Sequence, residues 1–334
     1  MSAVQPPHRP FLTLTSYDGI FRDVSDVIKS TSINYTMDAG TELKIELVDK
    51  NMEMLRAGYF RLGQTYDFVE FLSSDYADLD FGIDNFTLNS LDVKQGEGQN
   101  TDISLTFYNT VFSQLKNDLK PQSYKAANGF LYAQLVAKKY KLKFVGENVK
   151  GKQQTIKVKA KNNTESVWAV LQSAANDNQF LCFIANKTLF FASPKFLMGK
   201  WGLDKVMYKP VGETKEREFL YIPLVYPTPN NETRYFLTET PSFRKALDSP
   251  KIAEGSATIF GTSSRYLRPG MTVMVYGVNF QFNQAYLITS VDYEVESIEP
   301  TQINFANIAK LAPEDKAKVD EKISEVTVIS GSGN

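Results

Sequence analysis

Few residues in this sequence have the types and spacing that catalysis or metal binding requires. The chain has one cysteine, Cys182, and one histidine, His8. A single residue of each kind, far apart in the chain, cannot supply the clustered ligands of a zinc site. A serine or cysteine nucleophile with a histidine base would have to use His8, which stands in a proline-flanked N-terminal stretch. We therefore expect no metal site and no catalysis of this type.

Pairs of carboxylates are the remaining arrangement with catalytic potential. Asp78 and Asp80, and likewise Glu294 and Glu296, are separated by one residue, and such pairs can serve glycoside hydrolysis. Alternate residues of a β-strand share one face, so the same spacing also describes an exposed strand face. We favour the exposed face, and a carboxylate-pair glycosidase stays open as an alternative.

Charge and loop composition argue against nucleic acid and nucleotide ligands. Lys and Arg total 37 against 38 Asp and Glu, so no net positive field attracts DNA or anionic lipid. Gly96 and Gly98 lack the Lys and Ser/Thr of a phosphate loop and indicate a hairpin turn. Five lysines between residues 150 and 161 have no interleaved aromatics and are typical of a solvated strand face. We expect a protein without cofactors.

The N-terminus and the hydropathy pattern indicate no targeting or membrane segment. The first residues, MSAVQPPHRP, contain no apolar core of signal-peptide length. No later stretch approaches the roughly 18 apolar residues of a membrane-spanning helix. The sequence predicts a soluble protein made in the cytosol, without a membrane anchor and with a flexible N-terminus at residues 1–9.

Strand-type alternation dominates the first third of the chain. Leu43, Ile45 and Leu47 alternate with charged residues, and the segment around Ile33 repeats the pattern. Glycine-containing turn sequences separate these runs. The sequence predicts an antiparallel β-domain over residues 10–115.

Helical periodicity replaces this alternation in the middle of the chain. Leu131, Leu135 and Val136 form an apolar stripe with lysines opposite, and a further helix is expected from Thr164 to Asn176 with Thr164 as its N-cap. Short strands and a hairpin accompany these helices. The sequence predicts a small α/β domain over residues 116–200.

Apolar, β-branched and aromatic runs divided by Pro, Gly and Asn return after residue 200 and predict a second β-domain over residues 201–310. Pro313 then starts a short amphipathic helix, and residues 311–334 are expected to be this helix with a flexible tail. The predicted fold class is mainly β, with two antiparallel barrels flanking a small α/β domain.

Two short patterns occur in both β-rich segments in the same order. They are Arg61-Leu-Gly63-Gln-Thr65 with Arg268-Pro-Gly270-Met-Thr272, and Thr101-Asp-Ile103-Ser-Leu105 with Thr301-Gln-Ile303-Asn-Phe305. Gly63 and Gly270 permit a positive-φ turn, and the threonine that follows begins a strand. The collinear matches predict duplication of one β-domain.

Residues 267–305 resemble the tail hub family of long-tailed phages, the late-control or baseplate-hub proteins. The residues that carry the resemblance are Leu267, Pro269, Gly270, Gly277, Tyr286, Ile288 and Val291. They match the family's Leu-x-Pro-Gly turn, its glycine-bearing hairpin and its Tyr-x-Ile-x-x-Val strand. The predicted order of domains also resembles the hub architecture, in which two tail-tube-like barrels flank a smaller domain.

The resemblance implies a structural protein of the phage tail baseplate that is not an enzyme and is made in the host cytoplasm. Such hubs form homotrimers, in which two barrels per chain give a pseudo-sixfold ring that meets the hexameric tail tube. The opposite side of this ring binds a trimeric spike, other baseplate proteins contact the ring, and DNA passes through its centre. A cell-wall- or carbohydrate-binding module and a spike-base protein of a contractile secretion system are the alternatives.

The strand that begins at Val291 is expected to place Asp292, Glu294 and Glu296 on the face opposite its apolar residues. In a ring of barrels this acidic face would line either the channel or the exterior, and the sequence leaves both open.

Overall fold

The computed structural model describes residues 9–15, 21–71, 84–119, 128–148, 165–185, 187–200, 206–208, 217–219, 222–225, 236–237, 239–245, 253–260, 267–276, 278, 282, 284–294 and 301–307. The chain forms two compact units. The first contains the chain up to Asn178 with residues 182–190 and 292–299, and the second contains the rest. The predictions for residues 1–8 and for the C-terminal helix lie outside the described residues.

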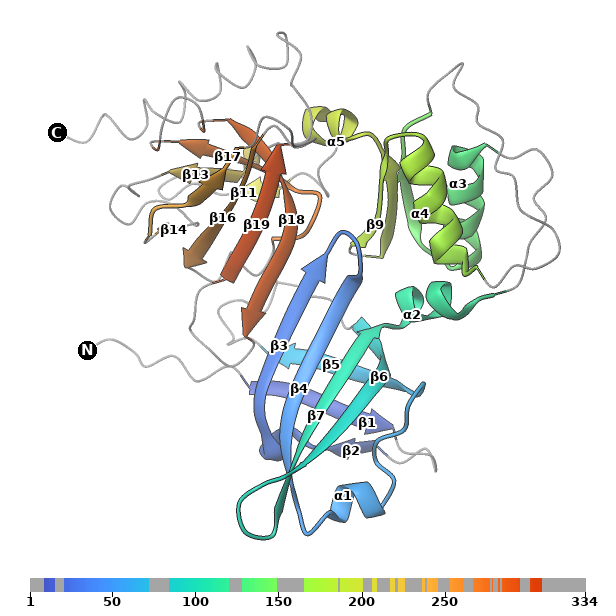
Figure 1. Ribbon diagram of the computed structural model, residues 1–334, viewed down its shortest axis with the longest axis vertical. Helices are drawn as coiled ribbons and strands as arrows, with labels where there is room; N and C mark the ends of the chain where they lie inside the picture. The colour runs from blue at the N-terminus through green and yellow to red at the C-terminus, as the bar shows by residue number, and fades with distance from the viewer. Residues whose placement is uncertain are drawn as a thin grey trace. The chain divides into compact units, whose positions relative to one another are not determined.

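Seven strands of one sheet, each antiparallel to its neighbours, begin the first unit (Figure 1). These strands are β1 (Arg9–Thr15), β2 (Phe21–Asp23), β3 (Ile28–Thr36), β4 (Gly40–Lys50), β5 (Thr65–Phe71), β6 (Asp84–Gln95) and β7 (Asn100–Asn109). Their spatial order is β3-β4-β7-β6-β5-β1-β2, and every neighbouring pair is antiparallel. A 3-10 helix, η1 (Ser25–Val27), precedes β3, and a short helix, α1 (Glu53–Arg56), follows β4.

The alternation predicted for these strands is confirmed. Leu43, Ile45 and Leu47 of β4 are completely buried, whereas Lys44 and Glu46 are exposed. One face of the sheet therefore packs into the core and the other is polar. The mainly β class with antiparallel sheets is confirmed. The strand path does not close on itself among the described residues, so the barrels stay a prediction.

Helices and a three-stranded sheet follow within the first unit. The helices are α2 (Thr110–Asn117), α3 (Gly129–Lys139) and α4 (Val167–Asp177), and the strands are β8 (Lys143–Gly146), β9 (Leu181–Ala185) and β10 (Thr188–Ala192) in the order β8-β10-β9. The rings of Phe183 and Phe190 stack at 4.7 Å across the β9–β10 hairpin. The predicted succession of helices, short strand and hairpin is confirmed.

Two details predicted for the helices are wrong. The N-cap of α4 is Ser166, whose Oγ accepts a hydrogen bond from the Ala169 N–H at 3.2 Å, so the helix starts later than a Thr164 cap would place it. On α3, Val136 is buried as predicted, together with Tyr132, Ala133 and Ala137, but Leu131 and Leu135 are each 44% exposed. The two alanines on this face permit close packing of the backbone, and the two leucines lie outside it.

Short strands dominate the second unit. Its elements are α5 (Pro194–Lys200), β11 (Val206–Tyr208), β12 (Arg217–Phe219), β13 (Ile222–Val225), β14 (Phe236–Leu237), β15 (Ser242–Arg244), β16 (Ala253–Phe260), β17 (Thr272–Tyr276), β18 (Ala285–Glu294) and β19 (Thr301–Asn307). Neighbouring strands follow the order β14-β16-β19-β18. In addition, β18 pairs with β17, β17 with β13, β15 with β16, and β11 with β12. β13 pairs with β17 in parallel, which departs from the purely antiparallel prediction.

The repeated sequence patterns form the same structure in both units. The Gly63 N–H donates to the Leu88 carbonyl, and the Leu88 N–H donates back to Gln64. The Gly270 N–H donates to the Ile288 carbonyl in the same way, and the Ile288 N–H donates back to Met271.

Both glycines have positive φ, 78° and 89°, as the third position of a type II turn requires. The strands around the two turns also correspond, because the orders β4-β7-β6-β5 and β16-β19-β18-β17 match in space and in sequence. The two β-rich segments thus share a four-strand unit.

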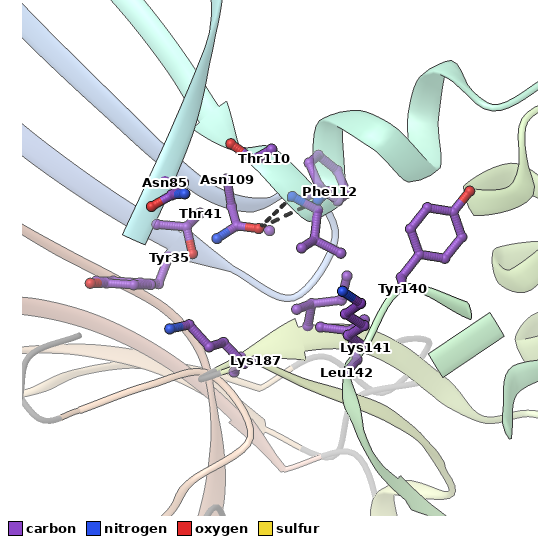
Figure 2. Close-up of a pocket in the computed structure, with 14 residues that line it drawn as sticks. Tyr35, Thr41, Asn85, Asn109, Thr110, Phe112, Tyr140, Lys141, Leu142 and Lys187 are labelled. Atoms are coloured by element: carbon purple, nitrogen blue, oxygen red, sulfur yellow. Dashed lines mark hydrogen bonds between the residues drawn. The ribbon is translucent and has the colours of Figure 1, made fainter. Parts of the chain in front are cut away.

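Gly40 joins the sheet of the first unit to its helices. A Cβ at this position would lie 3.0 Å from the Phe112 ring, and the backbone has φ of 71°. Phe112 is fully buried and packs edge-to-face on Trp168, with ring centroids 5.0 Å apart. Asn109 begins α2 by accepting hydrogen bonds from the N–H groups of Val111 and Phe112 (Figure 2).

Substitution of Gly40 should therefore weaken the packing between the sheet and the helices and lower the stability of the protein. Gly98 is the matched control, since it has φ of 66° with no atom within 4 Å of an added Cβ. We expect Gly98→Ala to cost about 1 kcal/mol for the left-handed backbone, and Gly40→Ala to cost about 1–3 kcal/mol more from overpacking. Urea unfolding followed by Trp168 fluorescence, in a Trp201→Phe background, measures both. Equal losses for the two variants would contradict this account of Gly40.

Candidate functional site

A row of polar side chains covers the exposed side of strands β3, β4 and β7. The register aligns Ser30, Ser32 and Asn34 of β3 with Glu46, Lys44 and Glu42 of β4. The same register aligns these β4 residues with Ser104, Thr106 and Tyr108 of β7. Cross-strand partners share a face, so these nine side chains lie on one surface, which we call the polar face. It exists because the opposite side of the same strands is apolar and buried.

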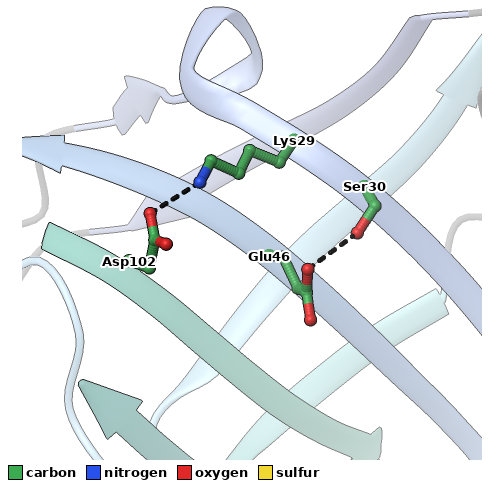
Figure 3. A network of polar contacts seen from close by, with 4 residues as sticks. All are labelled: Lys29, Ser30, Glu46 and Asp102. Carbon is green, nitrogen blue, oxygen red and sulfur yellow. Dashed lines mark hydrogen bonds and ion pairs between the residues drawn. The ribbon is translucent and has the colours of Figure 1, made fainter. Parts of the chain in front are cut away.

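A β-bulge turns a further lysine toward the polar face. The register of β3 against β4 shifts between Ile28 and Ser30, which leaves Lys29 as the extra residue. Its Nζ crosses β4 and lies 2.6 Å from Oδ1 of Asp102 on β7 (Figure 3). Beside it, the Ser30 hydroxyl donates to Glu46 at 3.4 Å. Both partners of the ion pair are nearly half exposed, so it contributes on the order of 1 kcal/mol or less.

Asp292, one of the predicted channel-lining residues, joins the polar face at its other end. The last residues of β18 belong to the first unit, where Tyr293 stacks on Tyr35 of β3 with centroids 6.2 Å apart. The Asn34 side chain hydrogen-bonds to the Asp292 carboxylate. Burial raises the pKa of Asp292 above its ordinary 3.8, although the Asn34 hydrogen bond and the charge of Lys44 act in the opposite direction.

Lys44 and Glu42 form the charged centre of this end of the face. Lys44 Nζ lies 3.0 Å from Glu42 Oε1, and this hydrogen bond and charge raise the pKa of Lys44. Burial, with the nearby Glu42, raises the pKa of the Tyr108 hydroxyl. With Lys29, Asp102 and Asp292 included, the polar face has four carboxylates against two lysines. Its surface is rich in hydroxyls and mildly acidic, which does not favour adhesion to nucleic acid.

The remaining acidic residues of this strand follow the expected alternation as far as the described residues extend. Val291 and Tyr293 are buried, Asp292 is half-buried and Glu294 is exposed. Glu294 therefore shares the side of the strand with Asp292. Glu296 lies outside the described residues, as does the carboxylate pair Asp78/Asp80.

The described residues of the predicted structural motif lie in turns, at the start of a strand or in the core. Gly63 and Gly270 form the matched turns, Thr65 begins β5, and Leu267, Pro269, Tyr286 and Val291 are buried. The Tyr286 hydroxyl donates to the Phe282 carbonyl at 3.0 Å. Gly277 lies outside the described residues.

Two observations on the described residues concern metal binding and the cysteine. It holds no group of three or more His, Cys, Asp or Glu residues placed to bind a metal ion. Cys182 is buried, and burial raises the pKa of its thiol far above the ordinary value. Among the same residues, no helix is long and apolar enough to cross a membrane.

Sequence reasoning identified Asp292 but not the residues around it. Asn34, Glu42 and Lys44 stand at the polar positions of strands whose alternation was visible in the sequence. What the sequence did not reveal is the pairing that brings residue 292 beside residue 34. The position of Lys29 on the polar face could not be predicted either, since a bulge changes the face on which a side chain lies.

Comparison with solved structures finds this fold in tail proteins. The tail protein from Neisseria meningitidis MC58 has a TM-score of 0.55 at 12% identity, covering 90% of this chain and 96% of its own. The 43 kDa tail protein of prophage MuSo2 from Shewanella oneidensis has a TM-score of 0.55 at 10% identity, covering 89% and 98%.

A third structure is the E. coli c3393 protein, a component of the type VI secretion system with similarity to the T4 tail proteins gp27 and gp5. Its TM-score is 0.52 at 10% identity, covering 85% of this chain and 74% of its own. A scan of protein-family models and a search of curated proteins found no match. The resemblance to phage tail proteins is confirmed at the level of the fold.

Neutralising Asp292 should stabilise the protein near neutral pH. Its pKa is raised on folding, so the ionised carboxylate is less favourable in the folded chain than in the unfolded chain. We expect Asp292→Asn to be more stable than wild type near pH 7. The advantage should shrink as pH falls through the raised folded-state pKa and vanish below the unfolded value of 3.8.

Denaturant unfolding across this pH range tests the expectation. Glu294→Gln is the control, because it makes the same charge change at an exposed position of the same strand. An Asp292→Asn variant that is less stable than wild type at neutral pH would show that its ion contacts outweigh the effect of burial.

Proposed function

We propose that this chain is a structural, non-enzymatic protein of a phage tail, and that it forms the central hub of the baseplate. The observation that carries the proposal is the extent of the shared fold. Two tail proteins match nearly the whole of this chain and nearly the whole of their own length. A module attached to an unrelated enzyme would match over only a part.

The duplicated strand unit supports the hub role physically. A tail tube with sixfold symmetry and a spike with threefold symmetry need an adaptor that presents both. Three chains, each with two equivalent β-units, provide six similar positions while retaining a threefold axis. The matched turns at Gly63 and Gly270 and the matched strand orders supply two such units in this chain. Tail tube, spike and other baseplate proteins are the expected partners.

The polar face is the proposed wall of the DNA channel. A channel must let a duplex pass without holding it, so cationic patches are unfavourable there. The polar face carries hydroxyls and an excess of carboxylates, and Glu294 adds a further negative charge on the side of Asp292. Like-charge repulsion would keep DNA from adhering to such a wall.

A spike-base protein of a contractile secretion system is the second candidate. The observation that favours it is the fold shared with the c3393 protein, a component of the type VI secretion system. That match covers 74% of the other chain, against 96% and 98% for the two tail proteins. We therefore place the phage tail first.

Assembly of the purified protein tests the hub proposal. Light scattering should detect a species of three times the 37.7 kDa chain mass, either alone or after addition of the cognate spike. A strict monomer under both conditions would exclude a trimeric hub.

Charge reversal tests the channel assignment. We expect Glu294→Lys/Glu296→Lys virions to eject DNA more slowly at low salt, where fixed charges attract the duplex most strongly. Glu97→Lys/Glu165→Lys is the control, since it makes the same charge change at two exposed sites outside the polar face. Unchanged assembly and ejection for the first variant would place this acidic strand away from the channel.

A further inference from the structure

A cavity of about 300 Å³ lies within the first unit, apart from the polar face (Figure 2). Four segments surround it: the β3–β4 hairpin, the start of α2 with Asn85 of β6, the end of α3, and the β9–β10 hairpin. Its 14 lining residues include two lysines, Lys141 and Lys187, and no carboxylate. In a chain with almost equal numbers of acids and bases, this cavity is locally cationic.

Both lysines occupy backbone positions that glycine usually fills. Lys141 has φ of 57° and ends α3, where the Leu142 N–H donates to Ala137 in the Schellman pattern. Lys187 has φ of 56° in the β9–β10 turn. A lysine is conformationally disfavoured at each site, so the structure of the turns does not explain its presence. Both side chains are exposed, and neither has an ion-pair partner among the described residues.

The interior of the cavity combines an apolar floor with a buried hydroxyl. Leu142, Ile184 and Ala185 supply buried aliphatic surface. Thr41 lines the cavity and is only 7% exposed, so it adds a buried hydroxyl to this surface. Asn109 uses its carbonyl oxygen to cap α2, which leaves its amide nitrogen as a donor on the cavity side.

The size and lining of the cavity limit the chemistry of its ligand. A volume of 300 Å³ is at the lower end for ligand sites, which fits one or two residues of a peptide better than a nucleotide. An apolar side chain beside a carboxylate matches both the floor and the lysines at the rim.

We propose that this cavity binds a short peptide segment of a partner protein, in which a carboxylate lies next to an aliphatic side chain. Lys141 and Lys187 would pair with the carboxylate, and the aliphatic side chain would contact Leu142 and Ile184. The carboxylate can be a chain terminus or a glutamate side chain, since both present the same group. The inference depends on the first unit alone and holds whether or not the chain is a tail hub.

NMR titration of the full chain with methyl-labelled Leu and Ile provides the test. The probes are acetyl-Gly-Ser-Val-Leu with a free C-terminus, the same peptide as its amide, and acetyl-Gly-Glu-Val-Leu-amide. The free-acid peptide, the glutamate peptide or both should shift the Ile184 and Leu142 methyl signals saturably. The amide without glutamate should bind at least about tenfold more weakly. Comparison of the two acidic peptides identifies the source of the carboxylate.

Lys141→Gly/Lys187→Gly is the decisive variant, because glycine suits both left-handed positions and the fold should be retained. It should bind the acidic peptides at least about tenfold more weakly than wild type. Lys94→Ala/Lys138→Ala removes the same charge at exposed sites outside the cavity and should bind like wild type. The proposal is wrong if neither acidic peptide shifts these methyl signals at about 10 mM, or if the glycine variant binds as tightly as the control.

Discussion

The register of β4 is the constraint on which the first unit depends. This strand pairs along its length with both β3 and β7, and it sends alternate side chains into the core and onto the polar face. A slip of one residue would move Leu43, Ile45 and Leu47 into water and bury charged neighbours, so the register is strongly fixed. The start of β4 is fixed by the close contact of Gly40 with the Phe112 ring. The end of β4 is fixed by the buried Asp49 side chain, which accepts hydrogen bonds from the N–H groups of Met54 and Leu55 in α1.

Local patterns in the sequence predicted much of this fold, and the reason is their regular period. The alternation in β3, β4 and β7, the hairpin turns and the Arg-x-Gly-x-Thr turns all depend on residues close together in the chain. The buried face of α3 was predicted correctly for Val136 but not for Leu131 and Leu135, because leucine is more hydrophobic than alanine, whereas the residues that pack inward include Ala133 and Ala137. Apolar content alone does not identify the face that packs.

Features that depend on distant residues could not be predicted from the sequence. The parallel pairing of β13 with β17, the side of β3 that Lys29 takes and the contact of Asp292 with Asn34 all depend on how remote segments pair. The cavity is a further case, because its walls come from segments that span about half of the chain. Lys141 and Lys187 line the same cavity only because the fold brings their two turns together. The candidate polar face was partly visible, since the polar positions were known but their neighbours were not.

The burial of Cys182 has a consequence for how the protein can be studied. It is the single cysteine of the chain, it is only 5% exposed, and burial keeps it in the unreactive thiol form. The native protein should therefore react very slowly with maleimides and other thiol reagents. A cysteine introduced at an exposed position would be the one reactive thiol. Fluorophores, spin labels or crosslinkers could then be attached at a chosen position without first removing a native thiol.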